Sequence, residues 1–426
     1  MLLVVIAFVV LLAMGMPVAF AIGISGALFF VQHPELPFTI PVQVTVSQTQ
    51  NFALLAVPLF ILAGNFLNRS GLTSRLVDLA SVLTGRMRGG LAQISVTLSA
   101  LMGGVSGSAI ADAAMQARML GSEMTSRGMT RGFAAGVLSF SAILTPIVPP
   151  GIGMILYGTI GNVSIGRLFA AGIVPALLLW LALSLAVWLT ARARGYPPQR
   201  TTRPTLKEAS FAVRAGIWAL LFPVFLLLGL RMGVFTPSEI GAFAVLYAIV
   251  IGSVVYRELS ARGFAEALET SLSDVGAVMV LIALSAIFSY GIVFEQIPAA
   301  VSAFVVGISG NLEIAMILIV ACVIAIGFFV DATVLIIILT PILLPTIRAL
   351  GGDPVHFGIV FIVAATIGNF TPPVGAAMYA VCTILDCRVG EYTRESLGLL
   401  AAVALVALAL VFLPGLVLFL PDLLFG

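Results

Sequence analysis

Charged side chains are scarce in this 426-residue chain. Lys, Arg, Asp and Glu make up only 9% of it, whereas apolar residues make up 61%. The mean hydropathy of +1.20 is far above what a water-exposed surface allows. Basic and acidic residues nearly balance, at a net charge of +2, which excludes the strongly basic surface that nucleic-acid binding requires. The composition therefore predicts one integral membrane domain surrounded by lipid.

Cysteine and histidine are also rare. The three cysteines, Cys322, Cys382 and Cys387, have no metal-ligand spacing, and an odd number cannot pair completely, so we interpret them as structural. The two histidines, His33 and His356, lie at the ends of apolar runs, far apart in the sequence. These absences argue against a metal centre and against an intramembrane hydrolase, which needs a base beside its nucleophile.

The few charges that exist indicate which connections lie in the cytoplasm, because short cytoplasmic loops collect Lys and Arg. Segment 192–214 holds six basic residues against one acid, and segment 69–90 holds four arginines against one acid. Segment 31–50 has no Lys or Arg and is expected outside. The chain is then predicted to begin in the cytoplasm and to end outside. Its first run has no basic start and is too long for a signal peptide, so it is expected to remain as a span.

Long apolar runs fill most of the chain. We expect single or broken spans at 4–30, 51–68, 131–163, 168–190, 211–231, 236–256, 275–293, 355–385 and 397–421. Segments 91–127 and 312–350 each read as two short helices around a cluster of small or polar residues, "GGVSGSA" and "GFFVDA". Such segments predict re-entrant hairpins, whose non-helical tips must be covered by protein or a water-filled cavity.

Two proline pairs interrupt apolar runs. Pro149 and Pro150 break the run 131–163, and Pro372 and Pro373 break the run 355–385, because proline removes a helical hydrogen bond and clashes with the preceding turn. The two pairs align without a gap when the sequence is shifted by 223 residues, and this shift also aligns the two hairpins.

The two aligned halves differ in charge. Segment 69–90 carries four arginines, whereas its counterpart 292–313 carries two acids and no base. The halves are therefore predicted to be inverted relative to each other in the membrane. Inverted repeats with broken helices are typical of secondary transporters, which bind substrate and ions near the midplane at the breaks.

The tips and breaks supply hydroxyls, flexible glycines and free backbone carbonyls, and hard oxygen ligands of this kind suit an alkali cation. We expect a sodium site built largely from backbone carbonyls at Gly103, Gly104, Ser106, Thr145, Pro149, Gly327, Asp331, Thr366, Gly368 and Pro372. We expect substrate contacts at Ser106, Gly107, Ser108, Pro150, Gly151, Thr371 and Pro373.

Several of these residues have a structural interpretation as well. The small residues of "SGS" also favour close helix packing without a ligand. Asp112 is a ligand, a proton carrier or, as we favour, a partner of the helix dipole. Asp331 is an ion ligand, an N-cap of the outgoing hairpin helix, or both. Thr366 is a ligand or bonds to its own helix.

Six motifs together resemble one family. They are "GGVSGSAIADAA", "GVFTPSEIGAFAV", "EQIP", "LTPILLP", "GDPVHFGIV" and "TPPVG", in this order along almost the whole chain. They are similar to the large membrane subunit (DctM-like) of tripartite ATP-independent periplasmic (TRAP) transporters. The chain departs from that family's pattern at Gly151 and Ala364, where a polar residue is common.

The resemblance implies a sodium-driven importer of organic acids in a bacterial or archaeal inner membrane. It also implies two partners, a periplasmic substrate-binding protein (DctP-like) and a small membrane subunit (DctQ-like) on a separate chain. An elevator fold is implied, in which a transport domain moves against a scaffold. The alternative is a channel, or a carrier for another small solute that works without a binding protein.

The predicted fold class is thus an all-α polytopic membrane protein with inverted repeats, two re-entrant hairpins and two discontinuous helices. The expected parts are scaffold helices 1–68, 164–293 (with the cytoplasmic loop 192–214) and 391–426, amphipathic arms 69–90 and 294–311, and transport-domain halves 91–163 and 312–390.

Overall fold

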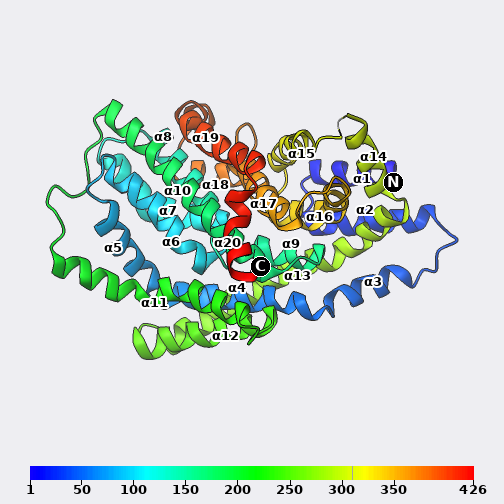
Figure 1. Ribbon diagram of the computed structural model, residues 1–426, viewed down its shortest axis with the longest axis horizontal. Helices are drawn as coiled ribbons and strands as arrows, with labels where there is room; N and C mark the ends of the chain where they lie inside the picture. Colours follow the sequence, from blue (N-terminus) through cyan, green and yellow to red (C-terminus); the bar gives the residue numbers. More distant parts are fainter. Residues whose placement is uncertain (309) are drawn as a thin grey trace.

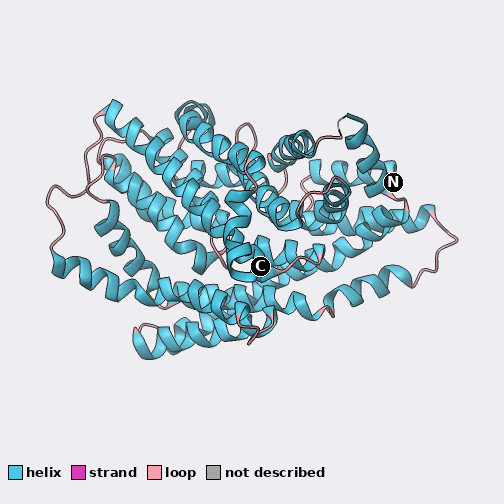
Figure 2. Cartoon of the chain, in the orientation of Figure 1, coloured by secondary structure: helices cyan, strands magenta, loops and turns pink. Residues whose placement is uncertain are grey.

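The computed structural model describes residues 1–308 and 310–426, and all regular structure in these ranges is helical (Figure 2). In chain order the helices are α1 (Leu2–Ala13), α2 (Val18–Gln32), α3 (Ile40–Thr49), η1 (Phe52–Leu55), α4 (Ala56–Arg69), α5 (Leu72–Thr84), α6 (Gly90–Ser106), α7 (Ala109–Ser126), α8 (Arg131–Ser141), η2 (Ala142–Leu144), α9 (Ile152–Gly161), α10 (Ile165–Arg194), α11 (Leu206–Arg231), α12 (Pro237–Val250), η3 (Ile251–Val255), α13 (Ala261–Phe294), α14 (Ile297–Ile308), α15 (Leu312–Gly327), α16 (Ala332–Ala349), α17 (Pro354–Phe370), α18 (Ala376–Ile384), α19 (Val389–Phe412) and α20 (Gly415–Phe425). The all-α polytopic prediction is confirmed, since seven helices in the described part of the chain are long and apolar enough to cross a membrane.

Helix starts follow local sequence rules. Thr205 and Thr236 open α11 and α12 with reciprocal bonds to Glu208 and Glu239 three residues on, which satisfies two backbone N–H groups that a helix start leaves unpaired. Asp353 accepts bonds from the first backbone N–H groups of α17. These polar residues fix where each apolar run begins its helix.

The expectation of one span over residues 4–30 is wrong. The run forms two helices, α1 and α2, separated by a turn at Gly15, whose φ is +82°, and at Pro17. Glycine tolerates this left-handed conformation, and proline cannot continue the preceding helix. The amino group of Met1 lies 2.8 Å from Glu295, and the His33 ring lies 4.0 Å from the same carboxylate. The chain start and the end of α2 therefore lie close together, beside the end of α13.

Three other segments also differ from the prediction. The run 397–421 divides at Leu413 and Pro414 into α19 and the short α20, because proline again ends a helix. Segment 31–50, expected to be a loop, contains α3. The predicted span 275–293 is the second half of the 34-residue α13.

The predicted internal repeat is visible in the helix boundaries. A shift of 223 residues places α7 on α16, the pair α8–η2 on α17, α9 on α18 and α10 on α19. Both hairpins and both discontinuous helices therefore form as expected. The two Pro–Pro bonds at the breaks are cis.

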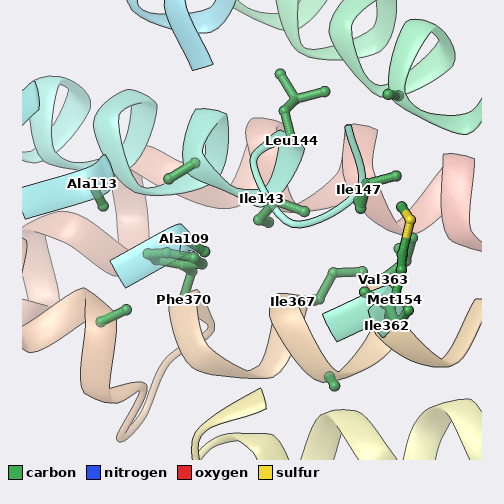
Figure 3. Packing of buried hydrophobic residues seen from close by; sticks show 14 of the residues in the cluster. Ala109, Ala113, Ile143, Leu144, Ile147, Met154, Ile362, Val363, Ile367 and Phe370 are labelled. Carbon is green, nitrogen blue, oxygen red and sulfur yellow. The ribbon is translucent and has the colours of Figure 1, made fainter. Parts of the chain in front are cut away.

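Each hairpin contacts both broken helices. The outgoing helix α7 packs against α8 of its own half and α18 of the other half. Likewise, α16 packs against α17 of its own half and α9 of the other half, so each outgoing helix contacts a segment from both halves. Figure 3 shows Met154 of α9 beside Ile362 and Val363 of α17. All three side chains are buried. This exchange brings the two tips and two breaks together in the middle of the molecule.

The remaining helices surround this centre. In Figure 1, α11 and α12 run along one long edge with α4, whereas α6–α8, α10 and α17–α19 lie above them. The helices α4, α12 and α13 contact one another. The arm helices α5 and α14 occupy the predicted ranges and precede each hairpin.

Candidate functional site

The first hairpin tip is a three-residue reversal at Ser106, Gly107 and Ser108. Gly107 has φ +64°, the left-handed region that glycine adopts without strain. A Cβ atom there would also approach Ile152 of α9 to 3.1 Å. The Ser108 hydroxyl accepts a bond from the backbone N–H of Ala111 and caps α7. The sequence "SGS" therefore forms a turn, and its two hydroxyls stay at the tip.

Asp331 occupies the second tip at the position equivalent to Ser108. Its carboxylate accepts a bond of 2.8 Å from the backbone N–H of Thr333 and one of 3.1 Å from the side chain of Asn369. The N-cap interpretation of Asp331 is thus confirmed. The same carboxylate also lines the central cavity, so capping does not remove it from the site.

Gly151 follows the first break because no side chain fits there. A Cβ atom at this position would lie 2.0 Å from the carbonyl oxygen of Pro146. At the second break the position equivalent to Gly151 is Val374, and at the glycine that follows it, Gly375, a Cβ atom would lie 2.5 Å from the carbonyl oxygen of Asn369. Each break is therefore a tight loop in which the backbone of a glycine packs directly against the backbone of a preceding residue.

Gly327 and Gly368, both expected to bind sodium, bring two helices into close contact. A Cβ atom on Gly368 would lie 2.6 Å from the Cα atom of Gly327, and one on Gly327 would lie 3.0 Å from that of Gly368. Small residues permit this approach of α15 and α17. In the first half, Gly103 faces Val148, and Gly104 faces Pro149 and Pro223 of α11.

A central cavity of about 320 Å³ lies where these parts meet. Its lining comes from both tips, both broken helices and two other helices, α4 and α13. Five of the predicted site residues line it: Ser106, Gly107, Ser108, Asp331 and Thr366. A second, small cavity of about 10 Å³ is lined by Gly104 and Pro150 together with Ser106 and Gly107.

The other predicted residues lie outside both linings. They are Gly103, Thr145, Pro149, Gly151, Gly327, Gly368, Thr371, Pro372 and Pro373. The hydroxyls of Thr366 and Thr371 donate to carbonyls of their own helix, Ile362 and Ile367, each at 2.7 Å. The structural interpretation of Thr366 therefore holds, although its side chain faces the cavity.

Five polar residues of the cavity were missed from the sequence: Asn65 and Asn68 of α4, Asp274 of α13, Thr333 of α16 and Asn369 of α17. The side chain of Asn65 donates to Ser271 at 3.0 Å and to Asp274 at 3.1 Å, which joins α4 to α13. Two amides three residues apart at the end of an apolar run were a usable signal, since they share one helix face.

The cavity is acidic and has helix N-termini around it. Asp274 and Asp331 line it, and the described lining contains no Lys, Arg or His. The first residues of α7, α9 and α16 also line it, and helix N-termini carry partial positive charge and unpaired N–H groups. Carboxylates and carbonyls are the groups that could hold cations in such a site, and the helix starts are the groups that could hold an anionic group.

The histidines have no place in this site. The ring of His356 is buried and lies 2.7 Å from the carbonyl oxygen of Leu410, and that of His33 lies 2.9 Å from the carbonyl oxygen of Phe29. Within the described residues no group of three His, Cys, Asp or Glu side chains is arranged to hold a metal ion.

Known proteins resemble the chain along its whole length. The chain is 33% identical over 416 residues to the sialic acid TRAP transporter large permease protein SiaM of Vibrio cholerae, covering 98% of this chain and 97% of that protein. It is 32% identical to the isethionate TRAP transporter permease protein DctMQ of Oleidesulfovibrio alaskensis, covering 97% of this chain but 65% of that longer protein.

Among solved structures, the Alcanivorax borkumensis YdaH transporter has a similar fold. The TM-score is 0.67 at 16% sequence identity, and the match covers 87% of each chain. A model of the family described as "Tripartite ATP-independent periplasmic transporter, DctM component" matches residues 5–416. In this chain two hairpins and two broken helices meet around a central cavity. The chain belongs to this DctM family of TRAP transporter membrane components.

Proposed function

We propose that this chain is the large permease subunit of a sodium-coupled importer of an organic acid. The acidic central cavity carries this proposal. Its two carboxylates, Asp274 and Asp331, have no basic side chain beside them in the described lining, so an organic anion alone would be repelled. Bound sodium ions offset this repulsion, and the starts of α7 and α16 hold the anion. Coupling of cation and anion then follows from electrostatics.

The transport domain of this proposal is larger than the sequence predicted. The helices α10 and α19, expected in the scaffold, are hydrogen-bonded to the hairpin and the broken helices. The side chain of Gln93 on α6 donates to the carbonyl of Ser184 on α10, and Tyr392 on α19 donates to the carbonyl of Phe370 at the second break, both in buried surroundings. We therefore assign α10 and α19 to the moving part of an elevator, with α4, α11, α12 and α13 as the scaffold.

Orientation in the inner membrane follows from charge and contacts. We place the loop 192–214 in the cytoplasm because of its six basic residues. Asp422 near the C-terminus pairs with Arg167 at the opposite end of α10, so the C-terminus lies outside. The N-terminus, expected in the cytoplasm, shares the contact at Glu295 with His33. We therefore place it outside as well.

Two partners complete the system. A substrate-binding protein outside the membrane is expected to deliver the organic acid, as the family resemblance implies. A small membrane subunit on a separate chain is also expected. The relative named DctMQ, of which this chain covers 65%, supports this, because its additional length and its name fit a fusion of both subunits.

Uptake into proteoliposomes tests the proposal. The chain is reconstituted with its small subunit, and the cognate binding protein loaded with labelled organic acid is added outside. We expect uptake only with an inward sodium gradient. Equal uptake with potassium in place of sodium, or without binding protein, would contradict the proposal and favour a channel or a carrier that works alone.

A further inference from the structure

A second polar group lies inside the first half, away from the central cavity. It comprises six side chains, each at most 1% exposed: Ser95, Ser99, Asp112, Gln116, Ser141 and Thr145. They belong to both helices of the first hairpin, to α8 and to the first break. We call this group the buried polar cluster.

Asp112 is the centre of the cluster. Its Oδ2 atom accepts bonds from the Ser99 hydroxyl at 2.8 Å, the Thr145 hydroxyl at 2.8 Å and the Gln116 amide at 3.0 Å. Its Oδ1 atom is buried and has no hydrogen-bond partner among the residues that the structure describes. None of the ion pairs among the described residues includes Asp112, so nothing cationic balances it. Burying such a group is costly, and in a membrane protein it indicates function.

The second half forms its hairpin without a cluster of this kind. The six positions 223 residues further on carry Leu318, Cys322, Leu335, Leu339, Ala364 and Gly368. The second hairpin nevertheless forms with the same helix boundaries to within two residues. A structural role alone therefore does not explain why the first half keeps an acid, an amide and four hydroxyls.

Thr145 gives the cluster its connection to the site. It directly precedes Pro146, which lines the central cavity, and the carbonyl of Pro146 closes the break against Gly151. The bond from Thr145 to Asp112 fixes the start of this loop to α7, whose first residues line the same cavity. Carbonyl ligands must be held in place to bind a cation well.

We propose that Asp112 is a positioning residue that, through Thr145, fixes the break of the first half and so sets the affinity for the cation bound there. The inference rests on the proposed sodium coupling. On this inference Asp112 is a buried carboxylate that influences a cation site without lining the cavity, and it has no counterpart in the second half.

Sodium dependence of uptake tests this inference. For Asp112→Asn and Thr145→Val we expect the sodium concentration for half-maximal uptake to rise about tenfold, as for one charge-assisted hydrogen bond, with the maximal rate at saturating sodium retained. Because both variants break the same connection, the double variant should show little further change. Thr145→Ser keeps the hydroxyl and should restore the wild-type sodium dependence.

Ser99→Ala is the matched control, because it removes another donor to the same oxygen without touching the break, and we expect a clearly smaller shift. The inference is overturned if wild-type uptake depends on sodium but neither Asp112→Asn nor Thr145→Val changes that dependence. It is also overturned if the double variant shifts the sodium dependence by the full sum of the two single shifts. If wild-type uptake does not depend on sodium, the proposed function is wrong and this inference is wrong with it. If Asp112→Asn does not reach the membrane, the comparison of Thr145→Val with Thr145→Ser decides.

Discussion

At the residue scale, the residue type at several site positions is determined by the space available for a side chain rather than by side-chain chemistry. Gly151 departs from the pattern that the resemblance implies, and the Pro146 carbonyl leaves no room for a side chain at this position. Gly327 and Gly368 similarly allow α15 and α17 to touch. Side-chain chemistry at the cavity is therefore concentrated in a few residues, of which Asp331 belongs to both the tip and the cavity.

Asp331 allows capping and ion binding to be separated. Asn is also a good N-cap, so Asp331→Asn should retain the fold while it removes the charge from the cavity. We expect the sodium concentration for half-maximal uptake to rise about tenfold to hundredfold, since a charged contact contributes about 1.5–3 kcal/mol. The measurement is uptake against sodium concentration at matched membrane expression.

Asp353→Asn is the control for this prediction, because Asp353 caps α17 in the same manner but does not line the cavity. It should leave the sodium dependence unchanged. Unchanged sodium dependence in Asp331→Asn as well would show that the second tip acts only as a helix cap.

At the element scale, hydrogen bonds divide the helices more clearly than hydropathy does. Trp180 of α10 donates to Thr97 of α6 at 3.1 Å, so α10 is bonded to the first hairpin. The helices α4 and α13, which we propose belong to the scaffold, are joined by the bonds of Asn65. Between these two groups, α4 and α10 meet through the rings of Phe60 and Phe169, whose centroids are 6.2 Å apart. Ring contacts without hydrogen bonds permit sliding more readily than paired polar groups do.

Cross-linking distinguishes helices that move together from helices that slide. In a background without the three native cysteines, a short thiol cross-linker joining cysteines at Thr97 and Trp180 should preserve uptake. The same reagent joining cysteines at Phe60 and Phe169 should block it, because α10 then cannot move along α4. The measurement is uptake before and after cross-linking, with reversal by reduction of a cleavable reagent. Equal uptake for both cross-linked pairs would place α10 in the scaffold.

At the scale of the whole molecule, the inverted repeat predicts which helix ends lie on the same side of the membrane. The first arm, α5, is bonded through Arg75 to Glu258, and Arg69 of α4 is bonded to Glu266, so the start of α13 lies beside the arginine-rich segment. The far end of α13 meets Met1 at Glu295. The 34 residues of α13 therefore connect the two sides.

Side-specific labelling tests this arrangement. Single cysteines at Arg203 and at Val301, in the cysteine-free background, should react with a membrane-impermeant reagent from opposite sides. An N-terminal tag should be accessible from the same side as Val301. Labelling of Arg203 and Val301 from one side would remove the inversion, and a tag on the side of Arg203 would contradict the hairpin of α1 and α2.

The sequence alone determined the membrane class, the two hairpins, the two broken helices and the repeat, because hydropathy and proline act locally and leave a direct trace in the order of residues. It also identified both tips and the capping role of Asp331. Local patterns misjudged the first run, where a single turn at Gly15 decides between one span and two helices. Only the tertiary structure decided which residues surround the cavity, because Asn65 and Asp274 come from helices more than 200 residues apart in the chain. Thr145 likewise bonds to Asp112 rather than facing the cavity, since packing, not spacing, sets the direction of a buried side chain.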